Sequence, residues 1–371
     1  MIIGVPRERK TLEKRVALTP DGASEVIKHG HTILIETGAG EAVEFFDSEY
    51  ESVGCEIASS LEEVWTRAEL LVKVKEPHQS EYQYFRPELT VFSFLHLAGL
   101  PEVAEKMLSG KVTGVAYELV KTEDGRLPLL EPMSEIAGKL SVINGSYYLL
   151  SQNQGRGLLL GGALGVPRAH VTIVGAGISG RAACEIAYGM GANITVLDID
   201  ARKLEIVKAQ FGNQVSAVSS TPAALARAAA ESSLLVGAVL IPGAAAPKII
   251  TREMIASMPK GAVFVDISMD QGGCAETSKA TSLDDPVYQV EGITHYGVCN
   301  MPSQAARTAT MALTSATLPY ILQLADQGCR EALKNSQRLK SGLNTIEGKL
   351  TNKEVANSLN LDFTDTEQAL G

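Results

Sequence analysis

Three side chains that can bind or transform a small anion follow short apolar runs of the chain: Arg15, Lys75 and His96. An arginine can bind a carboxylate through two hydrogen bonds, and a lysine can polarise a carbonyl group. A histidine can transfer a proton near neutral pH. If the apolar runs are parallel strands, all three side chains lie at strand ends, where ligands of parallel sheets bind. The pattern therefore favours a small anionic substrate.

Each of these side chains also has a structural interpretation. A lysine at a strand end is more often solvated or ion-paired than catalytic, and a histidine there is often a structural residue. Lys73 and Lys75 are two residues apart, which predicts that they share one face of a strand. The histidines lie at spacings that do not match a metal site, so we predict no metal.

A glycine-rich motif, Gly175-Ala-Gly177-Ile-Ser-Gly180, follows the apolar run His170–Val174 and precedes a helical pattern. Gly175 permits a tight turn, Gly177 lets a pyrophosphate approach the backbone, and Gly180 allows close helix–strand packing. Asp198 ends the next predicted strand, 18 residues after Gly180. This order of elements predicts a dinucleotide site.

The charges near the predicted ribose site bear on the choice of cofactor. The carboxylate of Asp198 can accept hydrogen bonds from both ribose hydroxyls and repels a 2′-phosphate, which favours NAD. Arg202 and Lys203 open the next predicted helix, and a cation there can instead favour NADP. These two side chains can also lie over the adenine or point to solvent, and our prediction is NAD.

A second acid, Asp270, follows the predicted strand Ala262–Ser268. At the carboxyl edge of a sheet it can bind ribose or transfer a proton beside a nicotinamide. Asp266 falls within the strand and is given a structural role. Gly272 and Gly273 are expected to shape the turn.

The elements that must position these groups alternate along the chain. Strands are predicted at residues 2–5, 32–36, 70–74, 90–95 and 112–119, with helices between them. Thr19-Pro20 and Pro101 predict two helix starts. This alternation predicts right-handed crossovers and a parallel sheet.

A second alternating unit follows a predicted connecting helix, Ser134–Gln154. Its strands are expected at residues 171–174, 193–197, 234–240, 262–268 and 295–299, and its helices at 179–190, 202–211 and 252–258. The helix Gln304–Asp326 leads out of this unit. The last residues, Asp362–Gly371, are predicted to be disordered.

Length and composition limit the classes of protein. A chain of 371 residues has room for about two domains. With 33 Lys and Arg against 43 Asp and Glu, the net charge is −10, which argues against nucleic acid or an anionic membrane as partner. Five cysteines without a CxxC pair predict reduced thiols in a cytoplasmic protein. We expect neither a signal peptide nor a membrane span.

Several motifs together resemble the L-alanine dehydrogenase family, which is related to the nucleotide-binding subunit of proton-translocating transhydrogenase. The motifs cover nearly the whole chain: residues 3–8, 15–20, 74–77, 94–97, 117–118, 132–138, the glycine motif, 270–273 and 300–302. The resemblance implies an α/β fold of two Rossmann-like domains with parallel sheets. The substrate domain would be discontinuous, with residues 1–129 plus 307–371, and residues 130–306 would bind NAD.

The resemblance also implies roles for individual residues. His96 and Asp270 would be the catalytic pair. Substrate would be bound by Arg15, Lys75, Met133 and Asn300. The NAD site would be formed by Ser134, Gly175, Gly177, Ile178, Gly180, Asp198, Lys203, Ser220, Val239, Leu240, Ile267, Asp270, Lys279 and Met301. Lys279 stands where we expect arginine in many members, and residues 303–307 depart from the family's pattern.

The implied activity is NAD-dependent oxidative deamination of L-alanine to pyruvate and ammonia, with reductive amination as its reverse. Family members are usually hexamers. A transhydrogenase nucleotide subunit, which needs a membrane partner supplied by another chain, is also compatible with the motifs. So are an aminating dehydrogenase for a different small 2-oxo acid, such as glyoxylate, and a non-catalytic NAD-binding regulator. A regulator has no reason to keep Arg15, Lys75, His96 and Asp270 at strand ends.

Overall fold

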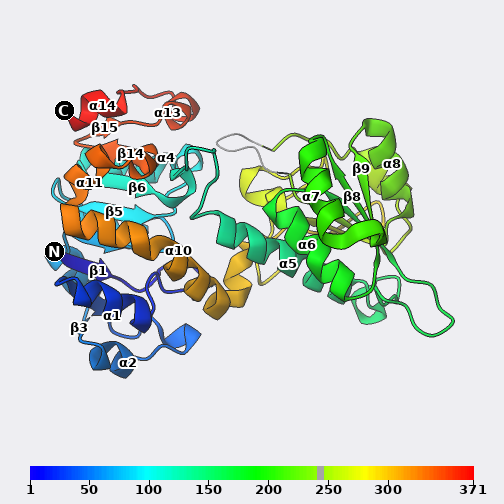
Figure 1. The fold of residues 1–371 in the computed structure, drawn as a ribbon, viewed down its shortest axis with the longest axis horizontal. Helices are drawn as coiled ribbons and strands as arrows, with labels where there is room; N and C mark the ends of the chain where they lie inside the picture. The colour runs from blue at the N-terminus through cyan, green and yellow to red at the C-terminus, as the bar shows by residue number, and fades with distance from the viewer. Residues whose placement is uncertain (240–245) are drawn as a thin grey trace. The chain divides into compact units, whose positions relative to one another are not determined.

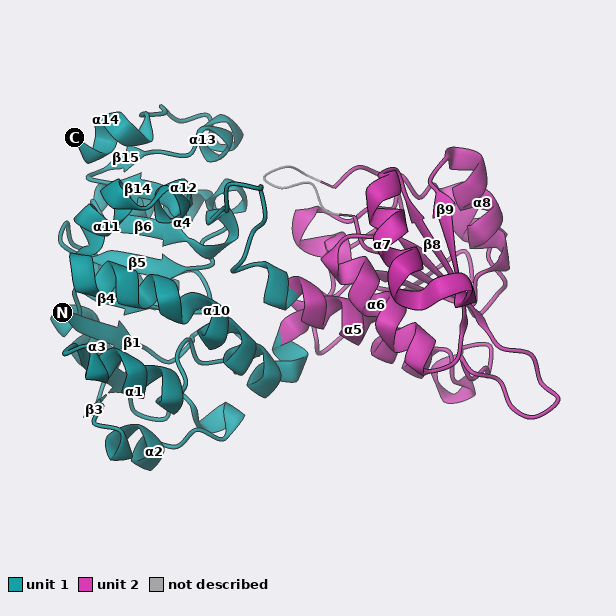
Figure 2. Cartoon of the chain, in the orientation of Figure 1, with its two compact units in different colours: residues 1–133, 303–371 teal, residues 134–302 magenta. Residues whose placement is uncertain are grey.

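The computed structural model describes residues 1–239 and 246–371, which form two compact units. Unit 1 comprises Met1–Met133 and Ser303–Gly371, and unit 2 comprises Ser134–Pro302 (Figure 2). Unit 1 is therefore assembled from two segments that are distant in sequence. The assignment of substrate binding to one predicted domain and NAD binding to the other stays a prediction.

Unit 1 contains an eight-stranded sheet with the order β15-β14-β6-β5-β4-β1-β2-β3. Six parallel strands come from the first segment: β1 Ile2–Val5, β2 Thr32–Glu36, β3 Glu56–Ala58, β4 Leu70–Val72, β5 Thr90–Ser93 and β6 Thr113–Ala116. The second segment adds β14 Leu343–Ile346, antiparallel to β6, and β15 Lys349–Leu350, antiparallel to β14. The C-terminal segment thus extends the sheet that the N-terminal segment begins.

Helices from both segments pack on this sheet (Figure 1). They are α1 Pro20–Lys28, α2 Asp47–Ser52, α3 Leu61–Arg67, α4 Pro101–Ser109, α10 Ala306–Gln327, α11 Cys329–Asn335, α12 Gln337–Gly342, α13 Lys353–Leu359 and α14 Thr366–Leu370. The predicted start of α1 is confirmed, because the Thr19 side chain accepts a hydrogen bond from the Gly22 N–H and Pro20 is the first helical residue. Helix α10 contacts α1, and Arg307 at its start lies over the ring of Phe45.

Unit 2 contains a seven-stranded sheet with the order β12-β13-β11-β10-β7-β8-β9. Its strands are β7 His170–Val174, β8 Asn193–Asp198, β9 Val215–Ser219, β10 Leu234–Gly237, β11 Val263–Asp266, β12 Val287–Val290 and β13 Ile293–Tyr296. All are parallel except β12. The helices are α5 Glu131–Tyr148, which begins in unit 1, α6 Ile178–Gly189, α7 Ala201–Phe211, α8 Pro222–Glu231 and α9 Arg252–Ser257.

Two glycines of α5 explain how this helix fits into unit 2. A Cβ on Gly138 would lie 2.1 Å from the carbonyl oxygen of Ser179 in α6, and a Cβ on Gly145 would lie 2.4 Å from Leu234 in β10. Both residues lower the intrinsic stability of a helix. Here their lack of a side chain permits close packing.

The predicted α/β class with mostly parallel sheets is confirmed. Strands β12, β14 and β15 are antiparallel and were not predicted. The predicted disorder of residues 362–371 is wrong, because α14 forms there and buries Ala369 and Leu370. Asp365 stabilises this helix by accepting a hydrogen bond from the N–H of Glu367.

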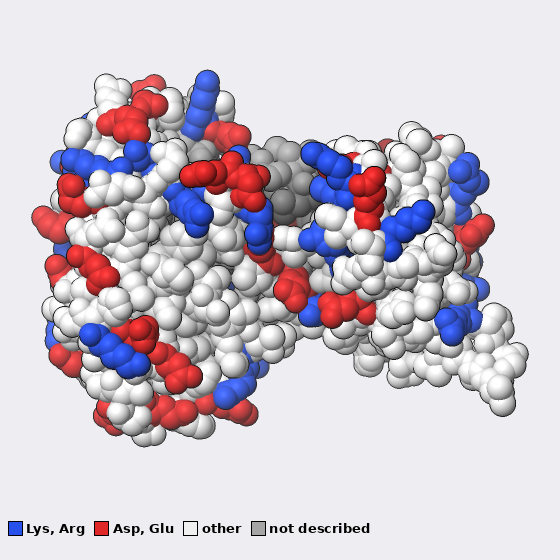
Figure 3. Space-filling view, in the orientation of Figure 1, with Lys and Arg blue, Asp and Glu red and all other residues white. Residues whose placement is uncertain are grey.

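Acidic and basic side chains are interspersed on the face of the molecule shown in Figure 3. Within the described ranges, no helix is both long and apolar enough to cross a membrane.

Candidate functional site

In unit 1 the topology brings four polar residues to one edge of the sheet. Arg15, Lys75 and His96 follow β1, β4 and β5, and Glu118 follows β6. These four strands are parallel neighbours in the order β6-β5-β4-β1. Because the carboxyl ends of parallel strands form a common edge, this is the place where a ligand of unit 1 is expected.

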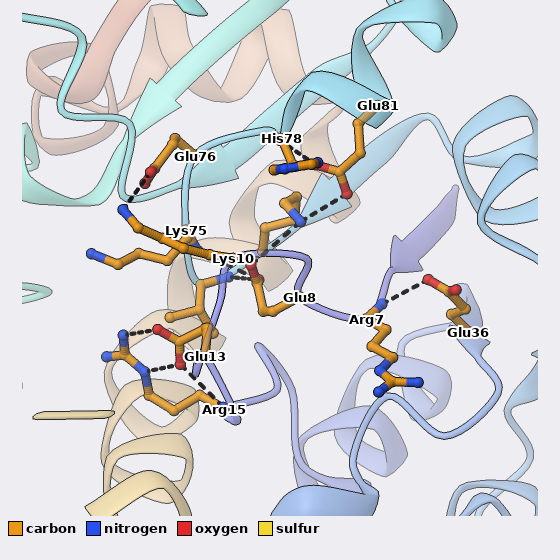
Figure 4. Close-up of polar contacts among 12 residues, drawn as sticks. Arg7, Glu8, Lys10, Glu13, Arg15, Glu36, Lys75, Glu76, His78 and Glu81 are labelled. Atoms are coloured by element: carbon orange, nitrogen blue, oxygen red, sulfur yellow. Dashed lines mark hydrogen bonds and ion pairs between the residues drawn. The ribbon is translucent and has the colours of Figure 1, made fainter. Parts of the chain in front are cut away.

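Arg15 is buried and is held by Glu13 (Figure 4). Its Nε donates to Glu13 Oε1 at 2.6 Å, and its Nη2 donates to Oε2 at 2.5 Å. Its Nη1 lies 3.2 Å from the Sδ of Met133. Glu13 therefore fixes the plane of the guanidinium by a bidentate contact. The structure brings the predicted residues Arg15 and Met133 together, whereas the sequence analysis gave Glu13 no role.

Lys73 and Lys75 have different environments, although the sequence predicts that both lie on one strand. Strand β4 ends at Val72, before either lysine. Lys73 is fully buried, with its Nζ 3.0 Å from Glu81 Oε1 and 3.4 Å from Glu8 Oε2. These internal ion pairs give Lys73 a structural role.

Lys75 has the less enclosed position, with 7% of its surface exposed. Glu8 Oε1 accepts hydrogen bonds from the backbone N–H groups of Val74, at 2.6 Å, and of Lys75, at 3.4 Å. A second glutamate that the sequence analysis left without a role thus holds the backbone of a predicted substrate residue.

His96 is exposed and has a left-handed backbone, with φ at 46°. Its ring stacks on Phe94, with the ring centroids 5.8 Å apart and the planes 5° from parallel. Glu118 accepts hydrogen bonds from the N–H groups of His96, at 2.6 Å, and Leu95, at 3.2 Å. Its Oε1 also lies 3.7 Å from His96 Nδ1. Glu118 therefore fixes a turn that a non-glycine residue seldom adopts without such support.

The glycine motif of unit 2 forms the turn between β7 and α6. Gly175 has a φ of +108°, and a Cβ on Gly180 would lie 1.7 Å from the Gly175 carbonyl oxygen. Among the described residues, a Cβ on Gly177 would meet nothing within 4 Å. Helix α6 begins at Ile178, and its N-terminus has no side-chain cap from the part of the chain that is described. An open approach to uncapped N–H groups fits a phosphate-containing group.

Asp198 ends β8 next to this turn. Its Oδ2 accepts from the Ala176 N–H at 2.7 Å, and its Oδ1 accepts from the Asp200 N–H at 2.8 Å. A carboxylate offers about four acceptor positions, so these two bonds leave capacity for ribose hydroxyls.

The two cations that follow Asp198 behave differently. Arg202 is 87% exposed, and its charge is paired with Asp200 at 3.0 Å. The Nζ of Lys203 lies 4.0 Å from Asp198 Oδ2. The turn Gly175–Gly180 and Asp198 thus fit NAD. Arg202, a cation that could favour a 2′-phosphate, is paired with Asp200 instead.

Other predicted cofactor residues also lie at the carboxyl edge of the unit 2 sheet. Ser220, Val239, Ile267 and Met301 follow β9, β10, β11 and β13, respectively. Leu240 lies outside the described residues. Ser134 lies in α5, and Lys279 is exposed, with its N–H donating to the Tyr288 hydroxyl at 2.7 Å.

Asp270 and Asn300 meet in unit 2. Asp270 is exposed on a turn after β11, and its Oδ1 accepts from the Asn300 N–H at 3.3 Å. Asn300 has a left-handed backbone, with φ at 59°. Asp266 is buried and accepts from the N–H groups of Ser268 and Cys274, which is the structural role predicted for it. Within the part of the chain that is described, no three His, Cys, Asp or Glu side chains gather into a metal-binding group.

Comparisons with known proteins match the whole chain. The family models "Alanine dehydrogenase/PNT, N-terminal domain" and "Alanine dehydrogenase/PNT, C-terminal domain" match residues 4–137 and 141–353. The chain is 47% identical to an alanine dehydrogenase from Methanococcus maripaludis, and the match covers 100% of both chains. A solved structure of an L-alanine dehydrogenase is 41% identical, with a TM-score of 0.94, covering 97% of this chain and 99% of the other. A transhydrogenase from Sinorhizobium meliloti shares the fold, with 24% identity, a TM-score of 0.81 and coverage of 95% and 99%.

Proposed function

Since the chain belongs to the alanine dehydrogenase/PNT family, we propose that it is an NAD-dependent L-alanine dehydrogenase. It oxidatively deaminates L-alanine to pyruvate and ammonium, and it catalyses the reverse reductive amination. The observation that carries this proposal is the meeting of Arg15, Lys75 and His96 at one sheet edge, in a chain that matches alanine dehydrogenases along its full length.

The substrate is held by residues of unit 1. The guanidinium of Arg15 binds the substrate carboxylate, because Glu13 holds it in a fixed orientation. Lys75 binds the same carboxylate or polarises the carbonyl of pyruvate. Met133, next to Arg15, shapes the substrate pocket of unit 1. Asn300, the other residue predicted to bind substrate, contacts Asp270 in unit 2.

The cofactor is held by unit 2, with the pyrophosphate on the turn Gly175–Gly180 and the adenosine ribose on Asp198. When bound there, NAD would supply the acceptor for the hydride of the substrate Cα. The remaining described residues predicted for this site, which line it, are Ser134, Ile178, Lys203, Ser220, Val239, Ile267, Lys279 and Met301.

The protein's own groups then move protons. The substrate amino group first gives up a proton, so that loss of hydride leaves an iminium ion, and water adds to the iminium carbon as a base removes a proton from that water. The carbinolamine so formed loses its hydroxyl proton and ammonia to give pyruvate. His96 or Asp270 is this base, and the same groups return a proton to the departing ammonia. Lys75 and Arg15 stabilise the oxygen that develops negative charge.

We also propose a cytoplasmic homo-oligomer, with a hexamer as the expected state. Leu159, Leu164 and Val166 are exposed on one segment between α5 and β7. Exposed apolar groups of this kind favour a protein–protein interface. All five cysteines are free thiols, which suits a reducing compartment. Light scattering of the purified chain, with a Leu164→Asp variant, tests the oligomer.

One assay tests the activity. NADH formation is followed with L-alanine, with other small amino acids and with a second nucleotide as hydride acceptor, and NADH consumption is followed with pyruvate or glyoxylate plus ammonium. We expect L-alanine and pyruvate to be preferred. Absence of NADH formation with every amino acid refutes the proposal, and hydride transfer only between nucleotides identifies a transhydrogenase subunit instead.

A further inference from the structure

Glu8 is a buried carboxyl group next to the proposed substrate residues that the mechanism above does not use. We propose that Glu8 is the positioning residue of Lys75 and that it takes up a proton when a substrate carboxylate binds to Lys75 and Arg15. This inference rests on the proposed function, because it assigns the substrate carboxylate to those two residues.

The positioning role follows from the hydrogen bonds of Glu8. Its Oε1 accepts from the N–H groups of both Val74 and Lys75, immediately after β4 ends. The Val74 carbonyl still accepts from the Phe94 N–H just after β5, whereas the N–H groups of Val74 and Lys75 donate to the Glu8 side chain. Lys75 is thereby held in place through its main chain.

The proton uptake follows first from the count of charges. Glu8 and Glu81 both pair with the single ammonium group of Lys73, and all three side chains are buried. When both carboxylates are ionised, the cluster carries one excess negative charge in a dry environment, which is costly. One proton makes the cluster neutral.

The hydrogen bonds decide which oxygen holds this proton. Glu81 has both oxygens in use, since Oε1 binds Lys73 and Oε2 accepts from the His78 N–H at 2.6 Å. Glu8 Oε2 is buried without a hydrogen-bond partner among the described residues, although it lies 3.4 Å from Lys73 Nζ. Glu8 is therefore the carboxyl group with an oxygen to protonate.

The titratable groups around Glu8 agree with this assignment. Burial raises the pKa of Glu8 to about 7, Lys73 opposes the rise, and the carboxylates of Glu81 and Glu13 add to it. Although burial opposes it, the charges of Glu8 and Glu81 raise the pKa of Lys73, which keeps this lysine charged. Burial and the charge of Glu8 also raise the pKa of Tyr117, which stays neutral.

Substrate binding should shift Glu8 towards its protonated form. Glu13 holds Arg15, and its charge already raises the pKa of Glu8. A substrate carboxylate on Arg15 and Lys75 places another negative charge in the same neighbourhood and raises the proton affinity of Glu8 further. Binding of a 2-oxo acid anion is therefore coupled to uptake of a proton, and it weakens as the pH rises above 7.

The coupling is measured by calorimetry on the full chain with NADH bound. Pyruvate is titrated in without ammonium, so that no turnover occurs, in two buffers with different ionisation enthalpies. We expect the wild type to take up about half a proton per chain at pH 7, since Glu8 is then half protonated. Glu8→Gln keeps an acceptor for the backbone N–H groups but cannot take up the proton. The number of protons taken up per chain should therefore fall close to zero.

Glu76→Gln is the matched control. Glu76 is also a carboxylate beside Lys75, and although burial opposes it, the charges of Lys75 and Lys10 lower its pKa. Its replacement removes the same charge but no group that titrates near pH 7, so the uptake is kept. Equal uptake in Glu8→Gln and wild type overturns the inference.

A second variant covers the case in which Glu8→Gln does not fold. Glu81→Gln leaves Glu8 and Lys73 as a balanced pair, so Glu8 is ionised at pH 7 and the maximum of proton uptake moves to lower pH. If the pH at which proton uptake is largest is the same in Glu81→Gln and in the wild type, the inference is contradicted. Failure of the wild-type chain to bind pyruvate at all is a different result, and it refutes the proposed function together with this inference.

Discussion

Glu13 and Arg15 form a bidentate pair in which both side chains are buried, with N–O distances of 2.6 and 2.5 Å. An arginine is usually described by the anion that it binds, yet here one edge of the guanidinium is held by the protein itself. The orientation of the group is therefore fixed before any substrate arrives, which lowers the entropic cost of binding.

Arg15→Lys removes this fixed orientation while keeping the charge. We expect kcat/KM for L-alanine to fall about 100-fold, which corresponds to roughly 2.7 kcal/mol, because lysine cannot make the two-point contact. NADH binding, followed by fluorescence, stays unchanged. Arg126→Lys, at an exposed pair with Glu131, is the control. A loss of less than threefold in Arg15→Lys contradicts the proposed carboxylate site.

His96→Ala and Lys75→Ala should each lose turnover while NADH still binds. Removal of a general acid–base group costs about 10²–10⁴-fold in rate, and this range is expected in kcat for His96→Ala. Lys75→Ala should raise KM as well, because it removes a substrate contact. His29→Ala, at an exposed pair with Asp326, should retain full activity. Turnover retained in either test variant removes that residue from the chemistry.

Alanine substitutions at Gly180 and Gly177 should affect different properties, the first folding stability and the second cofactor binding. A Cβ at Gly180 would lie 1.7 Å from a backbone oxygen, so Gly180→Ala should lower the melting temperature by several degrees. A Cβ at Gly177 meets open space, so Gly177→Ala should melt like the wild type. It should nevertheless bind NADH at least tenfold more weakly, because the methyl group occupies the approach of the pyrophosphate. Normal NADH affinity in Gly177→Ala would place the cofactor elsewhere.

Asp198 should determine the preference for NAD over NADP. Asp198→Ala removes the acceptor for ribose hydroxyls and the charge that repels a 2′-phosphate, while Lys203 remains 4.0 Å from the vacated position. We expect the ratio of kcat/KM for NAD to that for NADP to fall at least tenfold. Steady-state kinetics with both cofactors give this ratio, and an unchanged ratio argues against a ribose contact.

Glu8 should also make folding stability depend on pH. Its pKa is near 4.5 in an unfolded chain and about 7 in the folded one, so the folded chain holds an extra proton between these values. The resulting stabilisation is complete below about pH 4.5 and is lost as the pH rises to 7. The melting temperature should therefore be higher at pH 6 than at pH 8, and the difference should shrink in Glu8→Gln but not in Glu76→Gln. If the melting temperature differs by the same amount between pH 6 and pH 8 in the wild type and in both variants, Glu8 is not the group responsible.

The positions of the strands next to the site can be predicted from the sequence, whereas the side-chain contacts that orient the site residues cannot. β1 and β2 match their predicted ranges because each is a short apolar run with clear ends. β14 was missed because it pairs with β6, a strand more than 200 residues earlier, and β15 was missed because it pairs with β14.

The glutamates were missed for a similar reason. Glu8 and Glu118 lie in motifs that the sequence analysis singled out, but hydrogen bonds to the backbone of Lys75 and His96 leave no pattern in the sequence. The one signal in the sequence for Glu8 and Glu118 is that each lies at or just after the end of a predicted strand. Arg202 shows the same limit, because its pairing with Asp200 cannot be predicted from the sequence pattern.

The two-segment construction of unit 1 has a consequence for synthesis of the chain. Unit 2 is contiguous and is complete once Pro302 has left the ribosome, whereas β6 has no partner on its outer side until β14 emerges. An unpaired strand edge is a template for pairing with another chain. Until β14 pairs with β6, a nascent unit 1 therefore exposes a strand edge of the kind that favours misassembly with another copy.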